Sequence, residues 1–261
     1  MIRVGIGGWV FKPWRGAFYP EGLPQARELE YASRKLTAIE INGTFYSTQK
    51  PESFRKWAAE TPDDFVFSLK APRFLVNRRD LRTMAEGLTR FIDSGLSQLQ
   101  TKLGPLNWQL APTKPFDAAE IEDFLRMLPR EVDGVPLRHA LEVRHESFMT
   151  PEYLEIARKH RVATVFADTD EHPSFADVTA DFVYARLMRT VSAEPTGYAK
   201  TALATWAKQA GQWASGEDPS SLPRVEKGAR KEGPRDVFMF FISGAKERAP
   251  AAAQHLLTLL D

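Results

Sequence analysis

The 261-residue sequence contains no cysteine. This absence excludes disulfide bonds, thiolate metal sites and thiol nucleophiles, and it is consistent with a reducing compartment. An excess of charge of one sign is also missing, because 35 Lys and Arg side chains stand against 34 Asp and Glu side chains, for a formal net charge of +1. This balance argues against a protein whose main task is to grip nucleic acid or an anionic membrane.

Long apolar runs are absent as well. The first residues are interrupted by glycines, Lys12 and Pro13, so they do not form the unbroken apolar stretch of a signal peptide. No later run approaches the roughly 20 apolar residues that cross a bilayer. We therefore expect a cytoplasmic protein without membrane contact, and its oligomeric state is left open.

What the sequence does contain is a regular series of short apolar or β-rich runs. Hydrophobic residues make up 43% of the chain, which suits a packed core and argues against disorder. Strands are expected at residues 3–7, 38–41, 65–70, 105–110, 139–143, 164–167, 182–187 and 236–242.

Helix-like stretches separate most of these runs. They are expected at residues 24–36, 51–60, 81–100, 117–128, 151–160, 198–214 and 250–260. The stretch at 81–100 is one helix or two helices broken near Gly87. Residues 170–177, after the sixth strand, are typical of a loop. Residues 215–235 are rich in Gly, Pro, Ser and charge, which predicts a solvated excursion, with a substrate lid as the alternative.

Strand and helix thus alternate about eight times. Such alternation predicts parallel strands joined by crossover helices. Eight such units in ~250 residues match the number of units and the typical length of a (β/α)₈ barrel. We predict an α/β protein with a single TIM-barrel domain over residues 1–261, and a doubly wound open sheet is the alternative.

Polar side chains gather at the C-terminal ends of the expected strands, where TIM barrels carry their active sites. Glu40 and Asn42 alternate with Ile39 and Ile41, and the same alternation recurs in later strands, so the polar set is expected to face the barrel axis. Because burial of many ionisable groups is costly without a ligand, the pattern predicts a pocket. The side chains expected at its mouth are Glu40, Lys70, Gln109, Glu142, Arg144, Asp168 and Arg186.

Each of these charges also has a purely structural interpretation. A charged residue at a strand end is commonly a solvated cap or one half of a salt bridge, and barrels bury pairs of charges that only hold strands together. Glu40–Lys70 and Glu142–Arg186 are the candidates for such pairs.

A divalent cation is a further candidate ligand. Glu40, Glu142 and Asp168 supply the oxygen atoms that Mg²⁺ or Mn²⁺ prefers. Three cations stand at the same mouth, so direct neutralisation is slightly favoured over a metal. Zinc is less favoured, because among the histidines only His145 lies near a strand end.

Lys70 has two chemical interpretations. A desolvated lysine can act as a Schiff-base nucleophile. Nearby carboxylates would instead keep it protonated, which favours an electrostatic or anion-binding role. Arg144 and Arg186 suit bidentate capture of phosphate or carboxylate.

Seven motifs in order along the chain resemble the YecE-like family, domain of unknown function 72. They are GIGGW at residues 5–9, WRGAFYP at 14–20, IEINGTFY at 39–46, FSLKAPR at 67–73, KLGP at 102–105, EVRHESF at 142–148 and TADFVYAR at 179–186. The resemblance covers nearly the whole chain and implies a TIM-barrel fold. It implies no established activity.

The chain departs from this family pattern at two places. Met188 stands where members commonly carry a His soon after the strand-seven Arg. Ile242 and Ser243 stand where members commonly carry Asn after the strand-eight Phe. If the family His and Asn act chemically, this chain works differently or belongs to a divergent subgroup.

An aromatic loop covers residues 9–19, where five aromatic side chains are interleaved with Lys12 and Arg15. This composition favours a hydrophobic plug over the barrel rim, with stacking on a sugar or base as the alternative. Trp9 and Tyr46 are the best candidates for ligand contact.

The first functional hypothesis is an enzyme acting on a small polar or anionic substrate, such as a sugar or sugar phosphate. Glu142 or Glu40 is the expected general base, Lys70 and Arg144 stabilise developing negative charge, and Asp168 orients a partner or binds metal. The expected substrate contacts are Trp9, Asn42, Tyr46, Gln109 and Arg186.

Two other classes of function stay open. A phosphodiester hydrolase acting on nucleic acid can use the cationic cluster after strand three to grip phosphates. A non-catalytic ligand-binding barrel is the other. A glycosidase built on Glu40 and Glu142 is disfavoured, because strands two and five are distant around the ring. The cationic cluster consists of Arg73, Arg78, Arg79 and Arg82.

Overall fold

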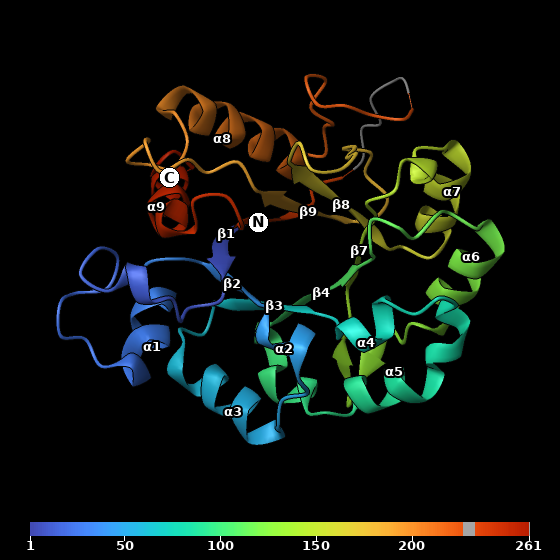
Figure 1. Ribbon diagram of the computed structural model, residues 1–261, viewed down its shortest axis with the longest axis horizontal. Helices are drawn as coiled ribbons and strands as arrows, with labels where there is room; N and C mark the ends of the chain where they lie inside the picture. The colour runs from blue at the N-terminus through green and yellow to red at the C-terminus, as the bar shows by residue number, and fades with distance from the viewer. Residues whose placement is uncertain (227–232, 261) are drawn as a thin grey trace.

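A computed structural model describes residues 1–226 and 233–260, and within them eight parallel strands close into a barrel (Figure 1). The order around the barrel is β1-β10-β9-β8-β7-β4-β3-β2. Pairing of β1 with β10 closes the ring, so the predicted TIM barrel is confirmed and the open sheet is excluded. The strands are β1 (Ile2–Gly7), β2 (Ala38–Ile41), β3 (Val66–Lys70), β4 (Leu103–Gln109), β7 (His139–Glu142), β8 (Ala163–Asp168), β9 (Phe182–Leu187) and β10 (Asp236–Phe241).

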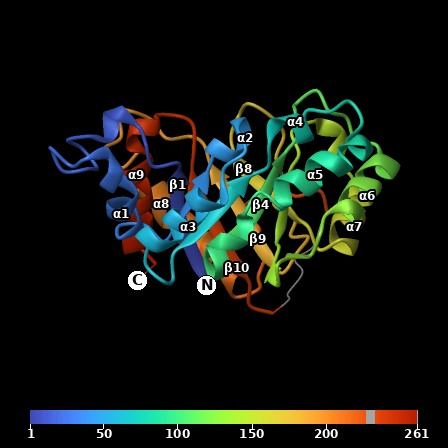
Figure 2. The same ribbon diagram turned by 90° about the horizontal axis from the view of Figure 1, so that it is seen from below.

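Helices surround the barrel (Figures 1 and 2). The α-helices are α1 (Glu28–Ser33), α2 (Gly43–Tyr46), α3 (Pro51–Glu60), α4 (Arg73–Val76), α5 (Ala85–Ile92), α6 (Ala118–Met127), α7 (Pro151–Lys159), α8 (Lys200–Ala214) and α9 (Ala249–Thr258). Short 3₁₀ helices lie at Lys12–Trp14, Gln25–Arg27, Leu81–Met84, Leu96–Lys102, Glu146–Phe148 and Lys246–Arg248. A small hairpin of β5 (Glu131–Val132) and β6 (Val135–Pro136) stands outside the barrel. In the described chain, no helix has both the length and the apolar character needed to cross a bilayer.

Two helices begin where the local sequence dictates. The side chain of Asp117 accepts a hydrogen bond from the backbone N–H of Glu120 at 2.8 Å, which caps α6. Thr150 accepts from the backbone N–H of Tyr153 at 3.3 Å and caps α7, whose first residue is Pro151. These caps satisfy backbone donors that the helices themselves leave unpaired.

The expected break within residues 81–100 lies at Gly95, not at Gly87. Helix α5 runs through Gly87, where an added Cβ would lie 2.7 Å from Leu75 Cδ2, so this glycine allows close packing. Gly95 follows the end of α5 with a φ of 108°, a left-handed value that glycine adopts without steric cost. Similarly, the expected helix at 24–36 is a 3₁₀ turn followed by the shorter α1.

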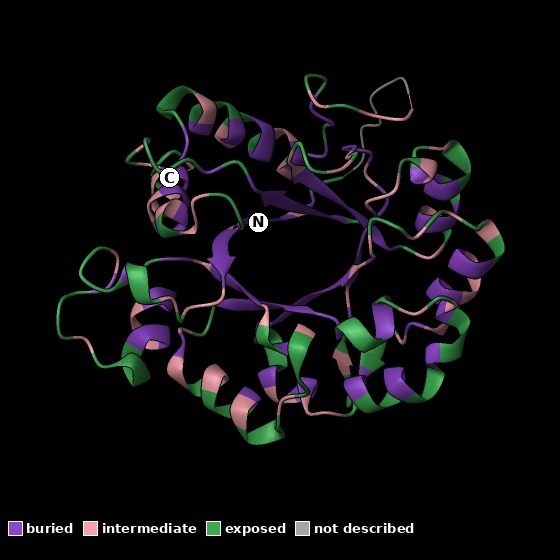
Figure 3. Ribbon diagram, viewed as in Figure 1, coloured by how far each residue is buried: buried purple, intermediate pink, exposed green. Residues whose placement is uncertain are grey.

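Alternation along the strands separates the barrel interior from the layer beneath the helices, and both are buried (Figure 3). Inside the barrel, Tyr184 and Phe240 share one cluster with Ala38, Ala140 and Ala163. Small residues on some strands thus leave room for large rings on others, which fills the interior. The two isoleucines of β2 belong to the outer cluster, as their alternation with Glu40 predicts.

The polar stretch at residues 215–235 is less solvated than expected. Asp218 and Arg235 are both buried and form an ion pair at 3.0 Å. Asp177 accepts hydrogen bonds from the backbone N–H groups of Val225 and Glu226 at 2.7 and 3.1 Å. The described part of the stretch is therefore held to the barrel by charge-assisted bonds, whereas residues 227–232 lie outside the described residues.

Gly5 supports the pairing of β1 with β2, and we expect Gly5→Ala to destabilise the fold. An added Cβ would lie 2.0 Å from the carbonyl oxygen of Ala38, so the strands would have to separate. The expected loss in the free energy of unfolding is about 2 kcal/mol or more, measured by urea denaturation.

Gly211→Ala is the matched control for that variant. Gly211 lies inside α8, where an added Cβ meets nothing within 4 Å. The substitution is expected to be neutral or to stabilise by up to about 1 kcal/mol, because alanine favours the helix. Equal effects of the two substitutions would contradict the close approach of β1 and β2.

Candidate functional site

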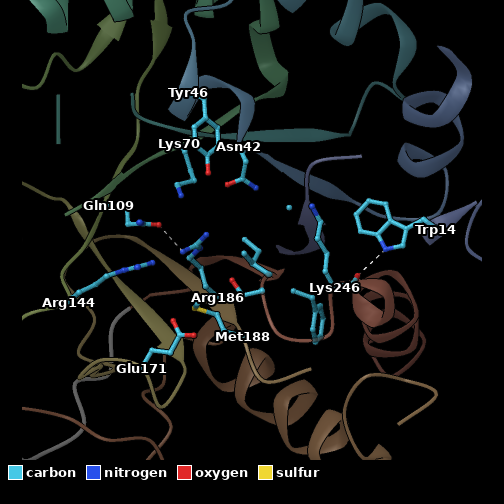
Figure 4. Close-up of a pocket in the computed structure, with 14 residues that line it drawn as sticks. Trp14, Asn42, Tyr46, Lys70, Gln109, Arg144, Glu171, Arg186, Met188 and Lys246 are labelled. Atoms are coloured by element: carbon cyan, nitrogen blue, oxygen red, sulfur yellow. Dashed lines mark hydrogen bonds between the residues drawn. The ribbon is translucent and has the colours of Figure 1, made fainter. Parts of the chain in front are cut away.

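The carboxyl ends of the strands surround a cavity of about 420 Å³, which we call the central cavity (Figure 4). Its position is that of the active sites of TIM-barrel enzymes. In the close-up, Tyr46, Asn42 and Lys70 point into the space from one side and face Arg186. The lining residues are Gly7, Trp14, Asn42, Tyr46, Lys70, Gln109, Arg144, Glu171, Arg186, Met188, Phe241, Ile242, Ser243 and Lys246.

Arg186, on β9, is almost fully buried and joins several strands. Its Nη1 donates to both carboxylate oxygens of Glu142, at 2.8 and 3.0 Å, and to Oε1 of Gln109 at 3.2 Å. Its Nη2 donates to Glu40 at 3.1 Å. The predicted Glu142–Arg186 pair is therefore confirmed. The alternative Glu40–Lys70 pair does not form, because Glu40 is bound by Arg186 instead.

Glu142, at the end of β7, has no exposed surface. Besides Arg186, its carboxylate accepts from Arg144 Nε at 2.8 Å and from Asn107 Nδ2 at 3.2 Å. Burial alone would raise the pKa of this carboxyl, but the charges of Arg186 and Arg144 outweigh it and lower the pKa to about 2. The carboxylate is thus ionised near neutral pH and fully occupied by donors, which makes it a poor general base.

Glu40, at the end of β2, is likewise buried, and both of its carboxylate oxygens accept hydrogen bonds. Its second oxygen accepts from the Tyr184 hydroxyl at 2.6 Å, and this hydroxyl lies 2.7 Å from Ser68 Oγ. Burial raises the pKa of Tyr184 well above its usual range, so the phenol stays a hydrogen-bond donor. Glu40 therefore lies beneath the cavity floor and is not among the lining residues.

Lys70 ends β3 and is held in place by the turn after β2. Thr44 donates from its hydroxyl to the Lys70 carbonyl at 2.7 Å, and the Phe45 ring centroid lies 4.1 Å from Nζ. Burial lowers the pKa of Lys70 to about 8, since the opposing effects of Glu40 and Glu142 are offset by the arginines that bind them. The carboxylates therefore do not hold the pKa of this lysine at its ordinary value, but a pKa of about 8 still leaves it mostly protonated near pH 7.

Lys246 enters the cavity from the loop after β10. Its Nζ lies 4.7 Å from the ring centroid of Phe11 and 5.5 Å from that of Trp14, and its carbonyl accepts from Trp14 Nε1 at 3.0 Å. Trp14 and Tyr19 are buried, so the aromatic loop forms a plug that also supports this cation. Burial lowers the pKa of Lys246.

Residues 3–261 match the family model described as protein of unknown function DUF72. The chain belongs to this family. It is 30% identical to the UPF0759 protein YecE of Escherichia coli K12 over 149 residues, 57% of this chain and 50% of the relative. It is 26% identical to the UPF0759 protein YunF of Bacillus subtilis over 161 residues, 59% of this chain and 55% of the relative. The chain spans about half the length of the curated relatives it matches.

Solved structures agree with the barrel fold of this DUF72 protein. A DUF72 family protein from Thermotoga maritima superposes with a TM-score of 0.75 at 22% identity, covering 100% of this chain and 99% of that one. The structure of SacUVDE gives a TM-score of 0.55 at 8% identity, covering 99% and 98%. A fusion protein with a xylose isomerase-like TIM barrel gives 0.50 at 14% identity, covering 99% of this chain and 42% of that one. At these identities the likeness shows the fold alone.

The positions at which this DUF72 chain departs from the expected family pattern lie together. Met188, Ile242 and Ser243 all line the central cavity. Ser243 has a φ of 64° and is followed by Gly244 with a φ of 56°, a sharp turn in which an L side chain is strained. One wall of the cavity therefore carries a thioether and an aliphatic side chain.

Four of the expected site residues do not line the central cavity, because Glu40 and Glu142 lie beneath it while Asp168 and Trp9 line other pockets. Asp168 ends β8 but lines a different pocket, where it accepts from the Tyr198 hydroxyl at 2.8 Å and pairs with Arg189 at 3.2 Å. Trp9 lines a smaller neighbouring pocket and packs against Trp57, with ring centroids 5.2 Å apart. The structure thus corrects the placement of Asp168, whereas ligand contact by Trp9 stays a prediction.

The candidate cation site, which the sequence favours less than direct neutralisation, does not assemble in the described residues. Among residues 1–226 and 233–260, no three His, Asp or Glu side chains are grouped so as to hold a metal ion. Arg186 stands between Glu40 and Glu142, and Asp168 lies in its own pocket. Arginine side chains neutralise these carboxylates directly, with Arg186 bound to Glu40 and Glu142 and Arg189 bound to Asp168.

The arginines after β3 lie apart from the central cavity. Arg82 forms an ion pair with Asp80 at 2.9 Å, and Arg78 donates to the backbone carbonyls of Phe74 and Thr83. None of the four appears among the residues that line the cavity.

Glu171 and Lys246 line the cavity although sequence analysis does not single them out. Both lie in loops that follow strands, β8 and β10, at the mouth of the barrel. Their position in the sequence could have identified them, because charged residues in the loops that follow barrel strands face the mouth of a TIM barrel.

We expect Glu142→Gln to lower the free energy of unfolding by about 3 kcal/mol or more, because it leaves the buried Arg186 and the partly buried Arg144 facing a neutral amide. Urea denaturation measures this loss. Glu86→Gln is the control, since Glu86 is 93% exposed in its pair with Arg90, and it should change stability by less than about 0.5 kcal/mol. Similar losses for both variants would argue against a stabilising Arg186 bridge.

Glu142 also predicts a pH dependence of stability. The carboxyl has a folded-state pKa of about 2 against an ordinary value of 4.5, so the unfolded chain takes up the proton first as pH falls. The contribution of Glu142 to the free energy of unfolding is fully present above about pH 4.5 and is lost as the pH falls toward about 2. Denaturation curves across this range should show the loss in the wild type and a smaller slope in Glu142→Gln.

Proposed function

We propose that this DUF72 protein is an enzyme that binds a small anionic, polar substrate at the carboxyl mouth of its barrel. The observation that carries the proposal is the charge of the central cavity. Four cations line it, whereas Glu171 is the single carboxylate among the described lining residues. The four cations are Lys70, Arg144, Arg186 and Lys246.

The distribution of ion pairs indicates which cations meet the substrate. Beneath the cavity, Glu40 forms an ion pair with Arg186, and Glu142 forms ion pairs with Arg186 and Arg144. Arg144 uses Nε and Nη2 for Glu142, so its Nη1 is left to face a ligand. Lys246 packs on aromatic rings and has no carboxylate partner among the described residues. An anionic group beside Arg144 Nη1 or beside Lys246 Nζ would receive charge-assisted hydrogen bonds.

Polar neutral groups complete the proposed recognition. The amides of Asn42 and Gln109 and the hydroxyl of Tyr46 belong to the same lining. Such groups suit the hydroxyls of a sugar or sugar phosphate, and the volume of about 420 Å³ suits a small molecule. We favour a small substrate over nucleic acid, because Arg82 is already paired with Asp80 outside this cavity.

The proposal predicts that inorganic phosphate and small sugar phosphates bind to the wild-type protein in calorimetric titrations. Lys246→Met keeps the aliphatic packing but removes a charge-assisted contact, so affinity should fall about tenfold or more. Lys208→Met, a change at an exposed position on α8, should leave affinity unchanged. Equal affinities in the two variants, or no binding to the wild type, would contradict the proposed anion site.

Catalysis is tested separately from binding. Incubation of a ligand that binds, followed by analysis of the recovered ligand, distinguishes turnover from capture. Chemical conversion that is lost in Lys246→Met at sub-saturating ligand supports an enzyme. Quantitative recovery of every bound ligand would instead assign a non-catalytic binding barrel.

A further inference from the structure

Among the cations of the central cavity, Lys70 and Lys246 form no ion pair with a described residue, and Lys70 is the more buried of the two. Its residue is only 8% exposed, yet its Nζ forms no ion pair or hydrogen bond with any residue in the described chain. Its closest described companion is the Phe45 ring at 4.1 Å, which offers a weaker and less directional interaction than a carboxylate. The amine therefore points into the cavity without a committed partner (Figure 4).

The surroundings of Lys70 explain this unusual state. The carboxylates of Glu40 and Glu142 are close enough to influence the amine, but Arg186 and Arg144 bind them and add positive charge to the same region. Desolvation and neighbouring cations lower the pKa of a lysine. At a pKa of about 8, a useful fraction of Lys70 is a neutral amine near physiological pH.

We propose that Lys70 is a nucleophile that forms an imine with the aldehyde or ketone group of a small anionic substrate. This inference rests on the proposed function and names the substrate class as an anionic carbonyl compound. The strand end and the Thr44 bond position the Lys70 backbone, and the Phe45 ring lies against its amine, so that the nucleophile faces the cavity from a defined place.

The reaction balances without an oxidant or reductant. The Nζ lone pair attacks the carbonyl carbon, the C–N bond forms, and the C=O π electrons move to oxygen. A proton passes from nitrogen to that oxygen to give a carbinolamine. Protonation of the hydroxyl then breaks the C–O bond, releases water and leaves the C=N bond. Tyr46, which lines the cavity and is 71% exposed, provides a hydroxyl that can relay protons with solvent.

The cavity also places the two ends of such a substrate. Arg144 or Lys246 can hold its anionic group while Lys70, which lines the same cavity, meets its carbonyl carbon. Met188 and Ile242 supply apolar wall beside the carbon skeleton. Positive charge near the amine disfavours protonation before attack and stabilises the alkoxide that forms during it.

Reductive trapping tests the proposal on the wild-type protein. Glyoxylate, a small anionic aldehyde, is added at pH 8 with sodium cyanoborohydride, which reduces an imine to a stable secondary amine. Peptide mass mapping then follows modification at each lysine. Lys70 should react about tenfold faster than the exposed Lys208, and its rate should rise through a midpoint near pH 8.

Three controls separate this inference from the proposed function. Inorganic phosphate should slow the reaction at Lys70 but not at Lys208. Acetaldehyde, which carries no anionic group, should show a smaller preference for Lys70. Lys70→Arg removes the primary amine but keeps a cation, so the fast trapping should disappear while Lys208 still reacts at its wild-type rate.

Each outcome decides between the two ideas. Phosphate binding without faster trapping at Lys70 overturns the imine and leaves the proposed function standing. Selective trapping that phosphate does not slow, and that acetaldehyde shares, keeps the nucleophile but overturns the anionic substrate. Absence of both phosphate binding and selective trapping overturns both. Fast trapping that persists in Lys70→Arg would assign the reactive amine to another lysine and overturn the imine at Lys70.

Discussion

A single buried guanidinium organises the carboxyl end of this barrel. Arg186 joins β9 to β7 through Glu142 and to β2 through Glu40. Three charges removed from water would be costly unless each met a partner and its remaining hydrogen-bonding capacity were used. Here every oxygen of the two carboxylates accepts at least one hydrogen bond, with Arg144, Asn107 and Tyr184 supplying the donors that Arg186 does not.

This arrangement decides the chemistry of the cavity above it. Arginines form the ion pairs with both glutamates, so the lysines that face the same space contact aromatic rings instead. Lys70 lies over Phe45, and Lys246 lies over Phe11 and Trp14. An ammonium group over a ring remains open to a ligand anion, whereas one tied to a carboxylate does not. The buried bridge thus explains why a chain of nearly neutral net charge presents a cationic cavity.

Alternation along single strands predicts much of this site. For Asp168 the same alternation predicts an outward side chain, which disagrees with the expected position at the mouth. Ala163 and Val165 face the barrel interior, so the two-residue period turns Phe166 and Asp168 outward, toward the layer beneath the helices. Lys246 lay beyond that rule, because it belongs to a loop. Its position depends on Trp14 Nε1, which bonds to its carbonyl across 232 residues of sequence.

The residues alone indicate an eight-stranded parallel barrel, because each run of apolar and polar positions carries its own period and its own turn signals. They also place polar groups at one end of that barrel, since all parallel strands end at the same edge. The choice of partners belongs to the tertiary structure. Arg186 meets Glu142 across 44 residues and Glu40 across 146, and only closure of the ring brings these side chains within hydrogen-bonding distance. Alternation assigns a side chain to a face, whereas the packing of the whole barrel selects the charge it meets there.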